Sequence, residues 1–396
     1  MNVRFEAWGA WVRLGSDAPQ VPVDLRGALV ALDREGALAA GLGPSARWTG
    51  DESRSEPLES HVAVTSRCAA GCTGCYQSAT PHGAHVARDA IERTLDDLAT
   101  RGVFTVAFGG GEPLERDDLG DLARAARARG LVPVVTTSGL GLDDARARHL
   151  VDFAQVNVSF DGAGADYEKV RGYDGARHAE RAIRALAGAG VRVGVNVVLT
   201  RDTFDSLRST LAAAQLAGAR EAQLLRYKPA GRAASLEYLA RRLRPEQVDR
   251  FPALLRALYT EHAPSFGLRI DCALVPFLSG DAEIDASVLA RAGVFGCEAG
   301  AALEAVRADG RRAPCSFGPA ADAHTTAAID AFTAAPPEPC ASCRLRTVCR
   351  GGCRVVAGFA AHGADDGEAR PFAFAPDPEC PRVRASSPRR SAPARA

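Results

Sequence analysis

The sequence lacks an excess of charge of either sign. Its 396 residues contain 48 Lys and Arg against 48 Asp and Glu, so the formal net charge is zero. A nucleic acid or an anionic membrane attracts proteins over a distance through a strong positive charge. Neither is therefore expected as a partner.

Long apolar runs and an export signal are also missing. No segment reaches the roughly 18 consecutive apolar residues of a membrane-spanning helix, and the first residues do not place a basic segment before an apolar one. We therefore expect a cytoplasmic protein. Lysine is scarce, occurring only as Lys169 and Lys228, and no repeat of solenoid length is visible; neither observation indicates a function.

Cysteine, by contrast, is plentiful, with eleven residues. Structural disulfides are rare in a reducing compartment, so metal ligation is the better explanation for this number. Complete pairing into disulfides would also leave one thiol over. One site with three cysteines and two sites with four would use all eleven.

The central part of the chain alternates apolar runs with amphipathic stretches. This alternation predicts an α/β fold with a parallel sheet and helices outside, either doubly wound or a partial barrel, with the chemistry at the carboxyl ends of the strands. The apolar runs are residues 61–66, 103–108, 131–137, 155–160, 191–200 and 221–227, and the helical stretches include 87–101, 119–129 and 177–189.

Residues 1–58 precede this pattern and are predicted to be an N-terminal extension. They contain a strand candidate from Val3 to Leu14 and a helix-like apolar stretch near Leu25–Leu42, followed by a polar linker.

The alternation stops after a helix predicted near Pro245–Glu261. Residues 265–383 are rich in Cys, Gly and Pro, with little periodic structure. Such a segment buries little apolar area, so we expect metal ligation to supply its folding energy. The basic Pro, Ser and Ala tail at residues 384–396 is expected to be disordered.

The most specific motif follows the first apolar run. Cys68, Cys72 and Cys75 stand in a glycine-containing loop. Three thiolates bind three irons of a four-iron cluster and leave the fourth open to another ligand. The alternative is a zinc loop, but the only nearby fourth ligands, His61 and His82, lack the spacing of a zinc knuckle.

This CxxxCxxC loop, with aromatic Tyr76 directly after it, resembles that of the radical S-adenosylmethionine (SAM) superfamily. The resemblance implies that SAM binds the open iron through its amino and carboxylate groups. It also implies reductive cleavage of SAM to a 5′-deoxyadenosyl radical that abstracts hydrogen from a substrate. The protein then positions the cofactor and excludes water.

A glycine-rich turn ends the second run, where residues 108–113 read FGGGEP. It resembles the GGEP motif of the same superfamily at its usual position. The resemblance implies that Gly110 and Gly111 let the backbone approach the cofactor and that the Glu112 carboxylate pairs with its ammonium group. Alone, such a sequence is more often an ordinary turn.

The fourth run ends in Ser159 and Asp161, and Arg171 follows ten residues later. This stretch resembles the S-x-D-G and R-G segments of the peptide-modifying branch. Short polar groups suit ribose hydroxyls and a guanidinium suits a carboxylate. The alternative has Asp161 starting a turn and Arg171 solvated. Residues 136–138, at the end of the third run, are less specific and are not assigned.

Seven cysteines near the C-terminus follow the spacing C-x12-G-x4-C, then CxxC-x5-CxxxC, then a last cysteine. The arrangement resembles the SPASM domain throughout. A pair of zinc ribbons is the alternative, but their spacing differs. The seven are Cys297, Cys315, Cys340, Cys343, Cys349, Cys353 and Cys380.

The SPASM resemblance implies two auxiliary clusters. The outer cluster would be bound by Cys340, Cys343, Cys349 and Cys380. The inner cluster would take Cys297, Cys315 and Cys353 and would lack one ligand. Cys272, in a strand-like stretch from Leu268 to Val275, would complete it. The alternative leaves Cys272 as a buried apolar residue and one iron open to substrate.

Together the resemblances imply a partial (β/α)6 TIM-like barrel of the radical SAM type followed by a SPASM domain. The expected division is an extension at 1–58, a radical SAM core at 59–263, a SPASM domain at 264–383 and a tail at 384–396. Three [4Fe-4S] clusters and SAM are the implied cofactors.

The expected function is oxidative modification or crosslinking, through a thioether or carbon–carbon bond, of a ribosomally made peptide. A sulfatase-maturing dehydrogenase is the first alternative, although that family generally has Asp where this chain has Ser316. Maturation of a redox-cofactor precursor peptide and a non-catalytic iron–sulfur or zinc regulator are the others. The expected partners are a precursor peptide, an electron donor such as flavodoxin or ferredoxin, and a separate leader-binding protein if the short extension does not serve.

Overall fold

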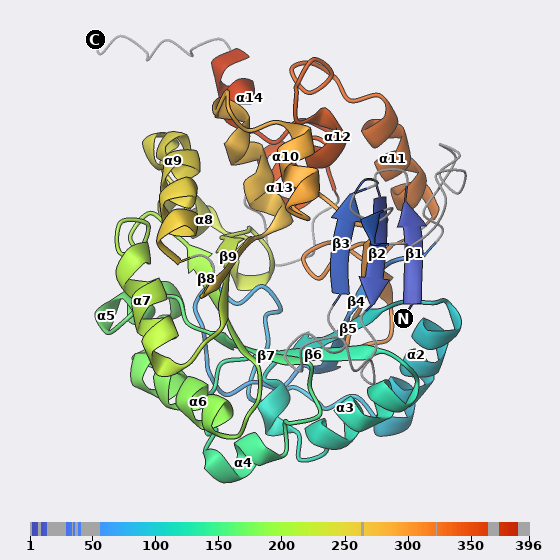
Figure 1. Ribbon diagram of the computed structural model, residues 1–396, viewed down its shortest axis with the longest axis vertical. Helices are drawn as coiled ribbons and strands as arrows, with labels where there is room; N and C mark the ends of the chain where they lie inside the picture. The colour runs from blue at the N-terminus through green and yellow to red at the C-terminus, as the bar shows by residue number, and fades with distance from the viewer. Residues whose placement is uncertain are drawn as a thin grey trace.

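The computed structural model describes most of the chain, and Figure 1 shows its course. The described residues are 2–6, 9–13, 29–33, 35, 39–40, 56–262, 265–321, 323–362 and 372–386.

A nine-stranded sheet forms the centre, in the order β10-β9-β8-β7-β6-β5-β4-β11-β12. All neighbouring strands are parallel except the pair β11 and β12. Each of the six predicted apolar runs overlaps one strand, which confirms the α/β fold of a partial barrel. These strands are β4 (Glu59–Thr65), β5 (Thr105–Gly110), β6 (Val132–Thr137), β7 (Gln155–Ser159), β8 (Val193–Leu199) and β9 (Glu221–Arg226).

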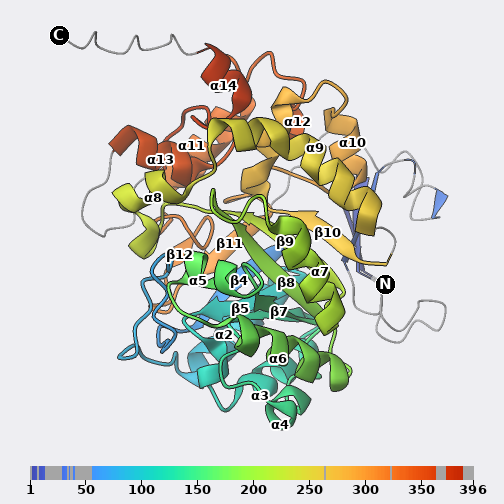
Figure 2. The ribbon, with the colours of Figure 1, turned by 90° about the vertical axis from the view of Figure 1, so that its left-hand side faces the viewer.

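Helices cover the outer face of these strands (Figures 1 and 2). They form because apolar residues recur every three or four positions; Ile91, Leu95 and Leu98, for example, are the buried residues of the first. The helices are α2 (Arg88–Thr100), α3 (Leu119–Ala128), α4 (Asp144–Arg148), α5 (Ala165–Arg171), α6 (Ala176–Gly188), α7 (Leu207–Ala217), α8 (Leu236–Arg241) and α9 (Pro245–His262).

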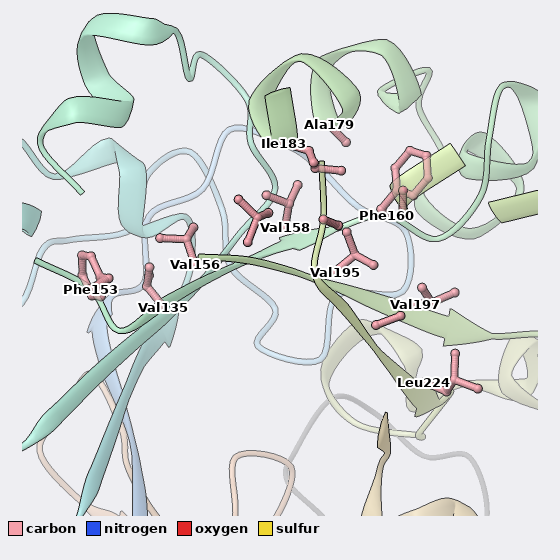
Figure 3. Packing of buried hydrophobic residues seen from close by; sticks show 14 of the residues in the cluster. Val135, Phe153, Val156, Val158, Phe160, Ala179, Ile183, Val195, Val197 and Leu224 are labelled. Carbon is pink, nitrogen blue, oxygen red and sulfur yellow. The ribbon is translucent and has the colours of Figure 1, made fainter. Parts of the chain in front are cut away.

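The alternation along each strand separates the hydrophobic core from the inner face. Figure 3 shows Val156, Val158 and Val195 beside Ala179 and Ile183 of α6, all buried in one cluster. Because successive side chains of a strand point to opposite faces, the intervening polar residues point inward. The same sequence pattern therefore places the valines in the hydrophobic core and the polar residues on the inner face of the sheet.

The C-terminal region extends this sheet at both edges. Strand β10 (Gly267–Ile270) pairs with β9, and β11 (Leu303–Val306) pairs with β4 and with β12 (Arg312–Ala313). The expectation that residues 265–383 have little regular structure was wrong. The strands in it are short and their pairing partners lie far away in sequence, so no local period reveals them.

The same region also shares the main hydrophobic core, through Leu274, Phe277 and Val348 among others. Metal therefore does not have to replace a core there. The predicted strand-like stretch Leu268–Val275 is confirmed only as far as Ile270, where β10 ends, and was wrong beyond it, because a 3-10 helix runs over Cys272–Gly280. The helices of this region are α10 (Ala286–Arg291), α11 (Ala323–Ala334), α12 (Arg346–Cys349), α13 (Arg354–His362) and α14 (Pro381–Ser386).

The N-terminal extension contains a separate antiparallel sheet in the order β1-β2-β3. The single strand expected from Val3 to Leu14 is two strands, β1 (Asn2–Glu6) and β2 (Gly9–Arg13). Strand β3 (Leu29–Asp33) lies where a helix-like stretch was expected, which was wrong because a short apolar run fits either structure. Strand β3 lies against α10. The polar linker falls mostly outside the described residues.

The chain end differs from expectation in part. Residues 384–386 belong to α14 and are therefore helical, whereas 387–396 lie outside the described residues. Among the helices that the structure describes, none is both long and apolar enough to cross a bilayer.

Candidate functional site

A cavity of about 990 Å³ lies on the inner face of the sheet. Residues from every strand between β4 and β10 and from β11 line it, together with loops that follow the carboxyl ends of the strands. Most sequence-predicted site residues meet here. They are Cys68, Cys72, Cys75, Tyr76, Gly110, Gly111, Glu112, Ser159, Asp161, Arg171, Cys272, Cys297, Cys315 and Cys353.

The first set of thiols stands in the loop after β4. The pKa of Cys68 is raised to about 11, mainly by burial and to a smaller extent by the nearby Glu112, Cys72 and Cys75. Three thiols that influence one another in a single loop fit three corners of a four-iron cluster. The donor set therefore suits the cluster that the motif predicted.

Arg232, which the sequence reasoning missed, holds this loop in place. Its Nε and Nη2 donate to the Cys72 carbonyl at 3.0 and 2.8 Å, and its Nη1 donates to the Ala79 carbonyl at 2.8 Å. Its backbone N–H donates to the Cys75 carbonyl at 2.9 Å. A planar guanidinium with several fixed N–H groups suits these three hydrogen bonds to two carbonyl groups. The one signal in the sequence that could have indicated Arg232 is its position six residues after the end of β9.

The glycines of the FGGGEP turn pack closely against the cysteine loop. A Cβ on Gly110 would lie 2.3 Å from the Thr65 carbonyl oxygen, and one on Gly111 would lie 2.0 Å from that of Arg67. Gly110 also has φ of +106°. These two glycines let the turn pack on the cysteine loop, and the expected close approach to the cofactor stays a prediction. Of the three glycines in this turn, Gly109 alone would have no atom within 4 Å of an added Cβ.

Glu112 is buried, and its carboxylate accepts four hydrogen bonds from the chain. Oε1 accepts from the Leu114 N–H at 3.0 Å and from Thr137 Oγ1 at 2.6 Å. Oε2 accepts from the N–H and hydroxyl of Ser138 at 2.8 and 2.5 Å. These contacts use all of the roughly four lone-pair positions of a carboxylate. Thr137 and Ser138, which the sequence reasoning left unassigned, thus belong to the site.

Asp161 and Arg171 form a buried ion pair rather than two separate contacts. Asp161 is fully buried, and its Oδ1 accepts the Val198 N–H at 2.6 Å. Arg171 Nη1 lies 3.8 Å from Cys72 Sγ. Asp161 therefore orients the guanidinium toward the cysteine loop.

Two polar residues on neighbouring strands face the cavity beside this ion pair. Ser159 of β7 pairs in register with Asn196 of β8, and both line the cavity. The Asn196 side-chain oxygen is buried and has no hydrogen-bond partner among the described residues. It is therefore a candidate contact for a bound ligand, which the sequence reasoning missed.

The second set of thiols lines the same cavity and comes from four separate segments. The pKa of Cys315 is raised to about 12, mainly by burial and also by the neighbouring Cys297 and Cys353. Burial also raises the pKa of Cys272, and Cys297 and Cys353 add to that rise. Cys272 is thus a neighbour of the inner cysteines rather than an isolated buried residue.

The third set does not line the cavity. The pKa of Cys340 is raised to about 11, mainly by burial, with Cys380 and Cys343 as neighbours. The pKa of Cys349 is also raised by burial and by the same two thiols. The eleven cysteines therefore fall into neighbourhoods of three, four and four. No three His, Cys, Asp or Glu side chains of the described residues are gathered tightly enough for one metal ion.

A buried ion network joins the two C-terminal sets to the sheet. Arg226 of β9 donates to both carboxylate oxygens of Asp377 at 2.6 and 3.0 Å. Asp377 also accepts the Cys353 and Glu379 N–H groups at 3.1 and 3.0 Å. One carboxylate thus fixes loops next to both the second and the third thiol sets.

Aromatic contacts join the first and second sets across the cavity. Tyr76, next to Cys75, stacks on Phe317 with ring centroids 4.5 Å apart. Lys228 lies 4.2 Å from the centroid of the same Phe317 ring and is paired with Asp271. The two sets of thiols therefore face one cavity.

Comparisons with known proteins agree with this geometry. Residues 62–214 match the Radical SAM superfamily. A PqqA peptide cyclase from Ruegeria pomeroyi is 32% identical over 174 residues, covering 42% of this chain and 46% of that protein. A mycofactocin maturase from Mycobacterium ulcerans is 28% identical over 342 residues, covering 80% and 86%.

Among solved structures, Streptococcus suis SuiB bound to its precursor peptide SuiA is similar, with a TM-score of 0.67 at 15% identity. The alignment covers 96% of this chain and 98% of SuiB. At this identity the likeness shows the fold alone. The chain aligns with less than half of the length of the PqqA peptide cyclase.

Proposed function

The chain contains a radical SAM domain within residues 62–214, and from this premise we propose that it is an enzyme that oxidatively modifies a ribosomally made peptide. The observation that carries the proposal is one cavity faced by a three-thiol loop and by a second set of four thiols. Relatives named as a peptide cyclase and a maturase support the peptide substrate.

We assign the first cluster to Cys68, Cys72 and Cys75. The inner auxiliary cluster is assigned to Cys272, Cys297, Cys315 and Cys353, and the outer one to Cys340, Cys343, Cys349 and Cys380. SAM bound at the first cluster supplies a radical that abstracts hydrogen from the substrate. Around it, Arg232 fixes the cysteine loop, Arg171 offers a cation to the methionine carboxylate, and the buried cavity wall excludes water.

The proposed division keeps an extension at 1–58, a radical SAM core at 59–263 and a SPASM domain at 264–383, with the sheet shared between the last two. A precursor peptide and an electron donor of the flavodoxin or ferredoxin class are the proposed partners, in the cytoplasm. A leader-binding protein is a further candidate partner.

The sulfatase-maturing alternative is less well supported. The residue after Cys315 is Ser316, so the carboxylate that generally serves that family as base is missing at this position. We therefore place this chain with peptide crosslinking enzymes, and the bond formed is a thioether or carbon–carbon bond.

Anaerobic reconstitution tests the function. The full chain is incubated with SAM, dithionite and the peptide encoded by a short reading frame beside its gene. We expect 5′-deoxyadenosine and a peptide product that is lighter by two hydrogens, detected by mass spectrometry. A protein with full iron that forms no 5′-deoxyadenosine would contradict the enzyme proposal, and cleavage without any change in the peptide would contradict that substrate.

Cys272→Ala tests the inner ligand set. If Cys272 binds iron, the variant loses iron or gains a changed paramagnetic resonance signal, because one iron of the inner cluster becomes open. Cys272→Ser, which retains a weaker ligand, should change less. If Cys272 is only a buried apolar residue, Cys272→Ala should lower the free energy of unfolding by about 1 kcal/mol and leave the iron in place. Full iron with unchanged spectra would refute the ligation.

A further inference from the structure

Ser316, His61 and Glu59 form a continuous chain of hydrogen bonds in the cavity wall. Ser316 Oγ lies 2.6 Å from His61 Nδ1, and His61 Nε2 lies 2.7 Å from Glu59 Oε1. All three residues line the cavity, and the His61 and Glu59 side chains retain about a third of their surface exposed, at 35% and 37%.

Strand pairing brings these residues together across 255 positions of sequence. His61 of β4 is in register with Ala305 of β11, and Ala305 is in register with Ala313 of β12. Ser316 follows Ala313 by three residues. The pairing of the strands therefore positions the backbones of His61 and Ser316 close to each other.

The chemistry of the partners fixes the direction of each hydrogen bond. An ionised carboxylate only accepts, so Nε2 of His61 carries the hydrogen toward Glu59. In neutral imidazole the other nitrogen is then a lone pair, and Nδ1 accepts the Ser316 hydroxyl. Burial acts to raise the pKa of Glu59, but the His61 hydrogen bond and the Arg269 charge outweigh it and lower that pKa.

Ser316 sits between the two thiol sets that face the cavity. The residue before it is Cys315, and the residue after it is Phe317, which stacks on Tyr76 of the first cysteine loop. A substrate that lies between these sets would thus meet the Ser316 hydroxyl.

The carboxylates that line the cavity elsewhere are already engaged. Glu112 accepts four hydrogen bonds, Asp161 is paired with Arg171, and Asp271 is paired with Lys228. Glu221 is paired with Arg192 and Arg269, and Glu298 with Arg350. Among the described residues that line the cavity, His61 is the only histidine.

We propose that His61, reached through the Ser316 hydroxyl and oriented by Glu59, is the proton acceptor of the oxidative step. The inference rests on the proposed function. When a carbon-centred substrate radical closes a bond onto a group X–H, the C–X bond forms, the X–H bond breaks, and one proton and one electron leave. The proton passes to Ser316 Oγ while the hydrogen of that hydroxyl moves to His61 Nδ1. An oxidised iron–sulfur cluster held by Cys272, Cys297, Cys315 and Cys353 would be the one-electron acceptor.

Two replacements test this relay in the reconstituted holoenzyme. In Ser316→Ala and His61→Asn, product per 5′-deoxyadenosine should fall by about tenfold or more, because general bases contribute at least that much. Cofactor cleavage itself should continue. Ser316→Asp should restore product, since a carboxylate at the same position can accept the proton. The exposed His85 also contacts a hydroxyl, that of Thr65 at 2.9 Å, but does not line the cavity, so His85→Asn should keep the wild-type ratio.

The hydrogen-bonded chain is also tested without any peptide. Diethyl pyrocarbonate should modify His61 more slowly than exposed His178, and Ser316→Ala or Glu59→Gln should accelerate the reaction at His61, as measured by mass spectrometry. Equal reactivity of His61 and His178 would overturn the proposal, as would an unchanged product ratio in His61→Asn. A wild-type enzyme that shows the protection but modifies no peptide contradicts the proposed function instead.

Discussion

The variant in which Cys68, Cys72 and Cys75 are all changed to Ala is expected to lose all cleavage of SAM and to keep its auxiliary clusters. Iron should fall from about twelve to about eight atoms per chain, because three four-iron clusters become two. The physical reason is that these thiols form a neighbourhood of their own, whereas the other sets stand on the C-terminal segments.

Iron analysis, paramagnetic resonance and a 5′-deoxyadenosine assay check this prediction. Cleavage that survives the triple change would refute the radical mechanism. Wild-type iron near four atoms with zinc bound in addition would refute the auxiliary clusters. The two outcomes separate the first thiol set from the C-terminal ones.

Glu112→Ala is expected to weaken SAM binding by roughly ten- to hundredfold without loss of iron. A charged group that loses its partner costs about 1.5–3 kcal/mol, and each factor of ten in affinity is about 1.4 kcal/mol. The change should also lower the melting temperature, because buried donors of Thr137 and Ser138 lose their acceptor. Equilibrium binding and thermal unfolding of the reconstituted protein measure both effects.

Ser138→Ala discriminates between the roles of this carboxylate. Glu112 can pair with the cofactor ammonium only if one of the four donors of the chain leaves the carboxylate and so frees a lone pair on it. Ser138→Ala removes one of these donors, the Ser138 hydroxyl. We expect that variant to bind SAM as well as wild type or better. Exposed Glu246, at the start of α9, supplies the matched control for removal of a carboxylate. Unchanged affinity in Glu112→Ala would make Glu112 a purely structural residue.

Local sequence was sufficient for the six central strands and for three of the helices between them, α2, α3 and α6. Valines alternate with polar residues in β7, β8 is mostly valine, and apolar residues of α6 recur at helical spacing, so local sequence determined each of these elements. The cysteine spacings and the FGGGEP turn are likewise local. Ligation of iron by the eleven cysteines remains a prediction.

Elements whose stability depends on distant partners could not be predicted in this way. Strand β3 consists of five apolar and acidic residues that fit a helix equally well until β2 pairs with them. Strands β10 and β11 are four residues each and exist because β9 and β4 offer open edges. Their sequences carry too few residues to show a period.

The sequence by itself determined which residues we assign to the chemistry of this protein, because motif spacing within a loop is a local property. Tertiary structure alone decided what those residues contact. Arg232 reaches back to the Cys72 carbonyl, and Ser316 meets His61, because the folded chain brings together segments that are far apart in sequence; for Ser316 and His61 this happens through the pairing of β4 with β11 and of β11 with β12. No local pattern encodes such pairs, since their free energy comes from burial and hydrogen bonds formed only after the sheet has closed around the cavity.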